Sequence, residues 1–64
     1  MSYMEALKEV RESVGMTVAE LAEAAGVSRQ YVYALEAGRR DNPSKDIRLR
    51  IATALDVPPY AIAR

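Results

Sequence analysis

The fold is decided by residues 17–38, which read TVAELAEAAGVSRQYVYALEAG. They open with a capping box, in which the Thr17 hydroxyl accepts a hydrogen bond from a backbone N–H while the Glu20 carboxylate accepts one from Thr17. This pattern predicts a helix that ends at Gly26. Ser28 then caps another helix, because its hydroxyl can accept from the first turn. The apolar side chains expected to hold the two helices together are Leu21, Ala22, Ala25, Val27, Val32 and Leu35.

The segment before this stretch predicts one more helix, over residues 2–14. Apolar residues recur there at the spacing of a single helix face, and Gly15 follows as a natural C-terminal stop. We expect this stripe to pack against the pair of helices that comes next. Its members are Tyr3, Leu7, Val10 and Val14.

The segment after the stretch predicts a fourth helix and a short fifth one. Ser44 can cap a helix that continues to Leu55. Residues 47–51 also alternate with the period of a strand, but the run that follows them and the other elements favour a helix. Pro58 and Pro59 end it, and Pro59 can open a final short helix. The buried stripe expected on the fourth helix is Ile47, Ile51 and Leu55.

The composition excludes several kinds of protein. The 64 residues contain no His and no Cys, so neither a disulfide nor a Cys/His metal site is available, and no catalytic constellation can be assembled. No apolar run approaches the roughly 20 residues that span a bilayer, and the N-terminus has no signal-peptide pattern. We expect one cytoplasmic domain over residues 1–64, without enzyme activity, cofactor, metal or membrane association.

The net charge is zero, but the charges are unevenly distributed along the chain. Residues 1–25 carry two basic and five acidic side chains, whereas residues 26–50 carry six basic and three acidic ones. Two explanations stay open at this point. Solvated helix faces can differ in sign without consequence, or the second segment can bind a polyanion such as nucleic acid.

Two short helices joined by a tight turn that contains a glycine have the geometry of a helix-turn-helix. Over nearly its whole length, the sequence resembles the phage-repressor/Cro type of helix-turn-helix DNA-binding domain. This resemblance implies an all-α, compact five-helix, lambda-repressor-like fold that binds double-stranded DNA sequence-specifically, as a small transcriptional regulator or repressor. The matching stretches are Leu7 to Arg11, Met16 to Ala22, Gly26 to Ser28, Val32, Leu35 to Gly38 and Ile51 to Leu55.

The resemblance makes the helix over about residues 28–37 the recognition helix, whose N-terminal part enters the major groove. Arg29 can donate two hydrogen bonds to guanine, and Gln30 can pair with adenine. Tyr33 can contact a base or a sugar, and Ala34 can touch the methyl group of thymine. An ordinary solvated helix start is the alternative for Arg29 and Gln30.

Phosphate contacts are expected from groups beside this helix. The two helix starts capped by Thr17 and Ser28 can bind phosphates with help from the helix dipoles. Arg39 and Arg40 are further candidates, unless they bind the C-terminal carbonyls of the recognition helix instead. The phosphate-contacting candidates are Thr17, Ser28, Tyr31, Arg39, Arg40 and Asn42.

Arg11 and Glu36 look like the family's internal ion pair, which joins the first helix to the end of the recognition helix. The resemblance implies that this pair is structural, so Arg11 is not counted among the DNA contacts. The alternative, an exposed Glu36 that faces DNA, would be electrostatically unfavourable because DNA is a polyanion.

The sequence departs from the family pattern at three places. Val18 stands where the family commonly has Gln, and it cannot hydrogen-bond a phosphate. Lys45 and Arg48 stand where the fourth helix is often apolar, which leaves the register of that helix open. Asp56 stands where the family usually has Gly, and Asp adopts a left-handed conformation less readily.

The apolar tail leaves two roles open. Val57, Tyr60 and Ile62 could pair two copies into a homodimer, since a two-fold dimer matches two half-sites about one DNA turn apart. They could instead close the core of their own chain, in which case a monomer suffices. A protein-interaction module, such as an antitoxin-like partner, is the alternative function.

Overall fold

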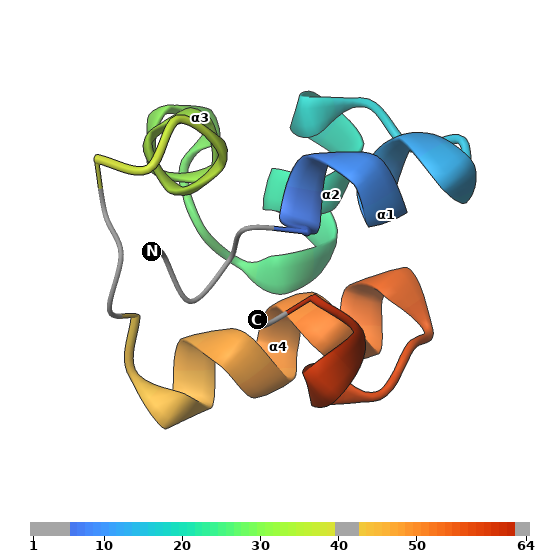
Figure 1. Cartoon of the computed structure of the whole chain (residues 1–64). Helices are drawn as coiled ribbons and strands as arrows, with labels where there is room; N and C mark the ends of the chain where they lie inside the picture. The colour runs from blue at the N-terminus through green and yellow to red at the C-terminus, as the bar shows by residue number, and fades with distance from the viewer. Residues whose placement is uncertain (1–5, 40–42, 63–64) are drawn as a thin grey trace.

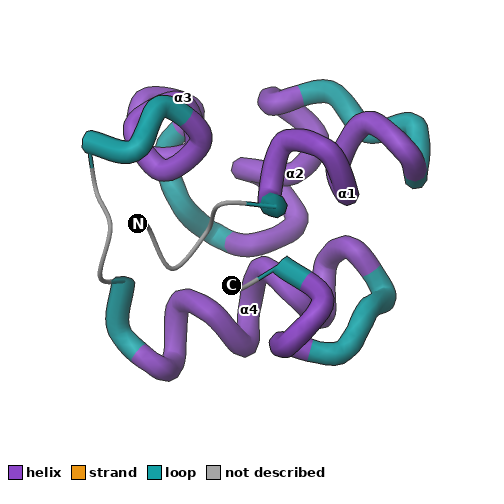
Figure 2. Tube along the Cα trace, in the orientation of Figure 1, coloured by secondary structure: helices purple, strands orange, loops and turns teal. Residues whose placement is uncertain are grey.

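The computed structural model describes residues 6–39 and 43–62. Within them the chain is helical and contains no strand (Figure 2), so the all-α prediction is confirmed. The helix count differs from the expected five, because the last element is a single 3₁₀ turn. Pro58 precedes that turn and Pro59 is its first residue, and the chain leaves it after three residues, which is too short for an α-helix. The elements are α1 (Leu7–Ser13), α2 (Val18–Ala25), α3 (Arg29–Glu36), α4 (Lys45–Leu55) and the 3₁₀ helix η1 (Pro59–Ala61).

Side-chain caps begin α2, α3 and α4 where the sequence predicts them. The hydroxyls of Thr17, Ser28 and Ser44 each accept the backbone N–H three residues later, at 3.0 to 3.2 Å. At Thr17 the return bond is also present, because its N–H donates to Glu20 Oε1 at 2.8 Å. These caps satisfy N–H groups that have no partner inside a helix, and so they fix where each helix starts.

The C-cap residues of α2 and α4 have a left-handed backbone. Gly26 closes α2 with a φ of 72°, which costs glycine nothing because it has no Cβ. Asp56 closes α4 with a φ of 58°, and it is the non-glycine residue with positive φ in the described part of the chain. The departure noted at Asp56 is therefore tolerated, since Asp can adopt this conformation at modest cost.

The core forms around α2, which packs against both α3 and α4. In Figure 1, α4 lies beneath α1 and α2, while α3 stands to one side and is viewed almost along its axis. Helix α1 contacts α3, and η1 packs against α4. The fully buried side chains come from all five elements or their immediate ends: Leu7, Leu21, Val32, Leu35, Ile51 and Ile62.

Three predicted stripe positions are less buried than expected, and the first of them, Val10, packs only partly buried against the core. Val14 is the C-cap residue of α1 and is 44% exposed, because the helix ends before it and its side chain leaves the apolar face. Ile47 packs on the core but is only half-buried, since it lies in the first turn of α4. Ile51 and Leu55 are buried as predicted. The part of the first helix expected over residues 2–5 lies outside the described residues.

Candidate nucleic-acid interface

The outward face of α3 carries the side chains predicted to read DNA bases. Val32 and Leu35 are fully buried, so the opposite side of the helix points to solvent. Arg29, Gln30 and Tyr33 are exposed there, and Tyr33 keeps 54% of its surface in water. Ala34 lies at the edge of this face and is half-buried. The face therefore offers a guanidinium, an amide and a phenol side by side.

The start of α3 is capped but not covered by negative charge. Ser28 Oγ accepts the N–H of Tyr31 at 3.0 Å, and no acidic residue lies in the first turn. The N-terminal N–H groups of a helix carry a partial positive charge, so an anion is favoured at this end. Ser28 is exposed, which leaves the cap accessible to a phosphate.

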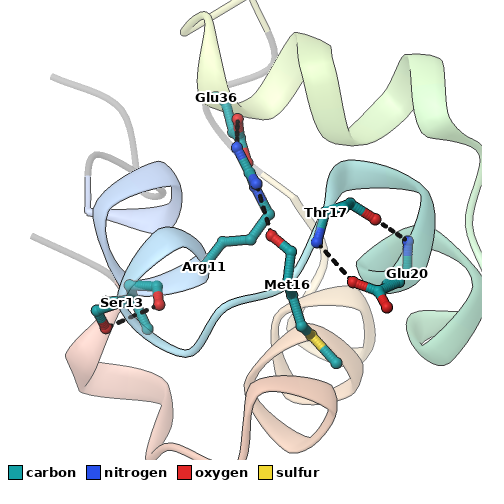
Figure 3. Close-up of polar contacts among 7 residues, drawn as sticks. Arg11, Ser13, Met16, Thr17, Glu20 and Glu36 are labelled. Carbon is teal, nitrogen blue, oxygen red and sulfur yellow. Dashed lines mark hydrogen bonds and ion pairs between the residues drawn. The ribbon is translucent and has the colours of Figure 1, made fainter.

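The start of α2 is different, because Glu20 covers it. The Glu20 carboxylate accepts the Thr17 N–H, and the Glu20 N–H donates to Thr17 Oγ1 (Figure 3). Two of the N–H groups predicted to bind phosphate are thus already engaged, one of them by a negatively charged group. The Thr17 side chain can still donate a hydrogen bond to a phosphate through its hydroxyl group.

The remaining phosphate candidates are placed differently from one another. Tyr31 is half-buried and packs its ring against the core, whereas Arg39 is exposed. The carbonyl of Ala34 accepts the backbone N–H of Arg39 at 2.9 Å, so the end of α3 is closed by backbone and needs no guanidinium. Arg40 and Asn42 lie outside the described residues.

Arg11 and Glu36 form a bidentate ion pair between α1 and α3. Arg11 Nε lies 2.6 Å from Glu36 Oε2, and the second bond, from Nη2 to Oε1, measures 3.2 Å. A third bond runs from Arg11 Nη1 to the carbonyl of Met16 at 2.8 Å (Figure 3). The two side chains are only 10% and 8% exposed. Glu36 is therefore neutralised and turned away from solvent.

The hydrogen bonds that Arg11 donates to the Glu36 carboxylate raise the pKa of Arg11 above its ordinary value, although burial acts in the opposite direction. A raised arginine pKa means that the guanidinium keeps its proton throughout the pH range in which proteins bind DNA. The guanidinium that joins α1 to α3 is therefore charged in this range.

Two features of the interface were missed by sequence reasoning. Lys8, on α1, lines a depression that also borders Tyr33 on α3 and Ala37, the C-cap residue of that helix. Its spacing of three residues from Arg11 places both on one side of α1, which was the available signal. Leu49, on α4, is the other missed residue: it is 44% exposed and lines a second depression together with Tyr60, the 81% exposed residue of η1 already considered for dimerisation, so the two form an apolar patch.

The three residues considered for dimerisation separate in the structure. Ile62 is fully buried and closes the core of its own chain, and Val57 packs partly against that core. Tyr60 is the exposed member of the set. In the described part of the chain, no helix is long and apolar enough to cross a membrane, and no group of three potential metal ligands occurs.

Three comparisons place the chain among known proteins. Residues 7–62 match the sequence model of a family described as helix-turn-helix. A protein of Methanocaldococcus jannaschii, named as an HTH-type transcriptional regulatory protein, is 54% identical over 52 residues, which cover 81% of this chain and 16% of that protein. The regulator SinR of Bacillus subtilis is 32% identical over 56 residues, covering 88% of this chain and 50% of SinR.

The chain therefore spans between a sixth and a half of the length of these relatives. A solved structure is similar as well, that of the restriction-modification controller protein C.AhdI from Aeromonas hydrophila. The two superpose with a TM-score of 0.86 at 37% identity, over 94% of this chain and 89% of that one. The chain belongs to the helix-turn-helix family of the phage-repressor/Cro type, and these relatives are named as HTH-type transcriptional regulators.

Proposed function

We propose that this chain binds double-stranded DNA sequence-specifically by placing α3 in the major groove, as the reading unit of a transcriptional regulator. The observation that carries the proposal is the outward face of α3, where Arg29, Gln30 and Tyr33 are exposed opposite a fully buried side. A guanidinium and an amide at a helix N-terminus match the hydrogen-bonding edges of guanine and adenine.

The names of the relatives support the regulatory role. We also propose that the protein acts in the cytoplasm, on DNA, without enzyme activity of its own. We take residues 1–64 as one DNA-binding unit on this basis. Thr17, Ser28, Tyr31, Arg39, Arg40 and Asn42 remain the proposed phosphate contacts, and Arg11 with Glu36 the proposed internal support.

Selection from a randomised duplex pool at about 150 mM salt tests the proposal, because non-specific binding is weak at that ionic strength. We expect enrichment of a motif that contains guanine and adenine within one half-site. A folded protein that enriches no sequence would contradict the proposal.

We further propose that two copies bind a palindromic site, pairing through Tyr60 and the neighbouring Leu49 rather than through Ile62. Both side chains are exposed, whereas Ile62 is already used inside its own chain. Sizing the protein–DNA complex distinguishes two copies per duplex from one. A half-site motif bound by a monomer would contradict this pairing.

The same apolar patch favours the second candidate function, a protein-interaction module. Such a module would hold a partner at Leu49 and Tyr60 and would not need the exposed polar side chains of α3. The selection experiment separates the two, because a pure interaction module enriches no DNA sequence.

A further inference from the structure

A shallow depression of about 400 Å³ lies beside the reading face of α3. Helices α1, α2 and α3 each contribute to its wall, so it exists only in the folded chain. On α3 it is bordered by the same outward side that carries Tyr33. The residues that line it are Lys8, Arg11, Val18, Tyr33, Glu36 and Ala37.

The charges around this depression leave one positive charge uncompensated. Arg11 and Glu36 bind each other bidentately, and their charges cancel. Lys8 is exposed, and it belongs to neither of the two ion pairs found within residues 6–39 and 43–62, which are Arg11–Glu36 and Asp46–Arg50. Glu12 follows Lys8 by one helical turn, but a lysine that precedes a glutamate by four residues is the less favourable order. Lys8 is thus a cation at the edge of a depression whose other charges are neutralised.

The other groups suit an anion with one apolar side. Val18 is 8% exposed and forms an apolar part of the wall. Tyr33 is 54% exposed and carries a phenolic O–H that can donate a hydrogen bond. An ammonium and a phenol at the rim of one depression are two donors for the same anion.

The position of the depression relative to DNA identifies that anion. A recognition helix fills the major groove, which is about 12 Å wide, and helices packed beside it lie about 8–10 Å from its axis. Groups on α1 that adjoin the outward side of α3 therefore come over the wall of the groove. The groove wall is formed by the phosphates of one strand, which carry the negative charge of DNA.

We propose that Lys8 and Tyr33 together hold one backbone phosphate of the bound DNA in this depression. The inference rests on the proposed DNA binding and adds a phosphate site to it. Lys8 supplies the charge, and the Tyr33 hydroxyl donates a hydrogen bond to a phosphate oxygen. Tyr33 thereby acts mainly on the backbone rather than on a base, which differs from the base-reading role expected from the sequence. Val18 contributes an apolar wall and no hydrogen bond.

The test combines protein variants with duplexes in which one phosphate at a time is replaced by an uncharged methylphosphonate. In the unsubstituted protein, we expect neutralisation of one particular phosphate in each half-site to weaken binding about tenfold. In Lys8→Gln, affinity for the ordinary duplex falls by about the same factor, and neutralisation of that phosphate has little further effect. The slope of log K against log salt falls by about 0.9, as expected for one lost phosphate contact.

Three controls make the test specific. Lys8→Arg keeps the charge and should restore the penalty at the same phosphate. Tyr33→Phe should reduce that penalty in part while leaving the selected base sequence unchanged. Lys45→Gln removes an equal charge from a different depression, on α4, and should leave the penalty at this phosphate intact.

Failure of this inference differs from failure of the proposed function. If the protein binds a selected duplex but Lys8→Gln retains the full penalty at every phosphate, the site is wrong and the DNA binding stands. If Tyr33→Phe changes the preferred base instead, Tyr33 is a base reader and the site is also wrong. If no duplex is bound by the folded protein, both fall together.

Discussion

Helices α2 and α3 follow the same local rules but present different chemistry to solvent. Each has eight residues, and each is capped by a hydroxyl that accepts an N–H at 3.0 Å. The third residue of α2 is Glu20, whose carboxylate returns a bond to the cap, whereas the third residue of α3 is Tyr31, whose ring packs on the core. The start of α2 is therefore covered by negative charge and the start of α3 is not. The same local sequence signals form both helices, but the third residue determines whether the helix start carries a negative charge, as in α2, or is accessible to an anion, as in α3.

Substitutions in the buried faces of α2 and α3, which the two helices have in common, should have the largest effects on stability. Leu21→Ala in α2 and Leu35→Ala in α3 each remove a fully buried side chain, and each should lower the free energy of unfolding by about 4 kcal/mol. Urea denaturation followed by circular dichroism measures this. A loss below about 1 kcal/mol at either position would contradict equal burial of the two helices.

Breaking the ion pair that joins α1 to α3 should have the second-largest effect on the free energy of unfolding. Arg11→Met alone leaves Glu36 as a nearly buried, unpaired carboxylate and should cost about 3 kcal/mol. Combining it with Glu36→Leu should recover most of that loss, because no charge is then left unpaired. The double-mutant cycle in urea gives the coupling energy.

The exposed ion pair on α4 is the matched control for this cycle. Asp46 and Arg50 lie 3.1 Å apart, but their side chains are 70% and 52% exposed. Arg50→Gln should therefore change the free energy of unfolding by less than about 1 kcal/mol. Equal losses in the two pairs would mean that burial does not set the strength of the Arg11–Glu36 pair.

Two arginines on and after α3 should divide base reading from backbone binding. Arg29→Ala should weaken binding to the selected site by about 1–3 kcal/mol and relax the preference at one base pair. Arg39→Ala should weaken binding to every duplex and flatten the salt dependence. Titrations of a specific and a scrambled duplex at several salt concentrations separate the two. An equal loss on both duplexes for Arg29→Ala would remove its base-reading role.

The charge that covers α2 should give the smallest effect. Glu20→Gln can keep the hydrogen bond to Thr17 while removing the negative charge from the helix start. We expect affinity for all duplexes to rise by roughly threefold, because charge effects at a helix end amount to about 0.3–1 kcal/mol. Binding titrations with the scrambled duplex measure this. Glu23→Gln, which also removes an exposed acid from α2 but lies beyond its first turn, is the control. An equal rise in both variants would indicate a general effect of net charge.

Much of the fold was predictable because the signals are local. Capping hydroxyls and apolar periodicity are set by neighbours within four residues, so the starts of α2, α3 and α4 follow from the sequence. The predictions failed at two helix ends, which capping hydroxyls and apolar periodicity do not determine. Val14 belongs to the apolar pattern, but α1 stops before it, and the fifth helix is reduced to a 3₁₀ turn that begins at Pro59.

The candidate site was predictable only in part. The exposed face of α3 follows from the burial of Val32 and Leu35, which periodicity gives directly. The Arg11–Glu36 pair joins residues 25 positions apart, and only resemblance to a family suggested it. The depression at Lys8 needs three helices at once, so the spacing of Lys8 from Arg11 places both on one side of α1 but does not reveal the walls that α2 and α3 supply.

The three hydrogen bonds of Arg11 have a thermodynamic consequence for association. One guanidinium ties α1, the carbonyl of Met16 and the end of α3 together before any partner arrives. The backbone of the reading helix is thus already ordered in the free protein, and association loses conformational entropy mainly in side chains such as Arg29 and Gln30. Docking is then close to that of a rigid body, and its heat-capacity change reflects the surface covered rather than helix formation.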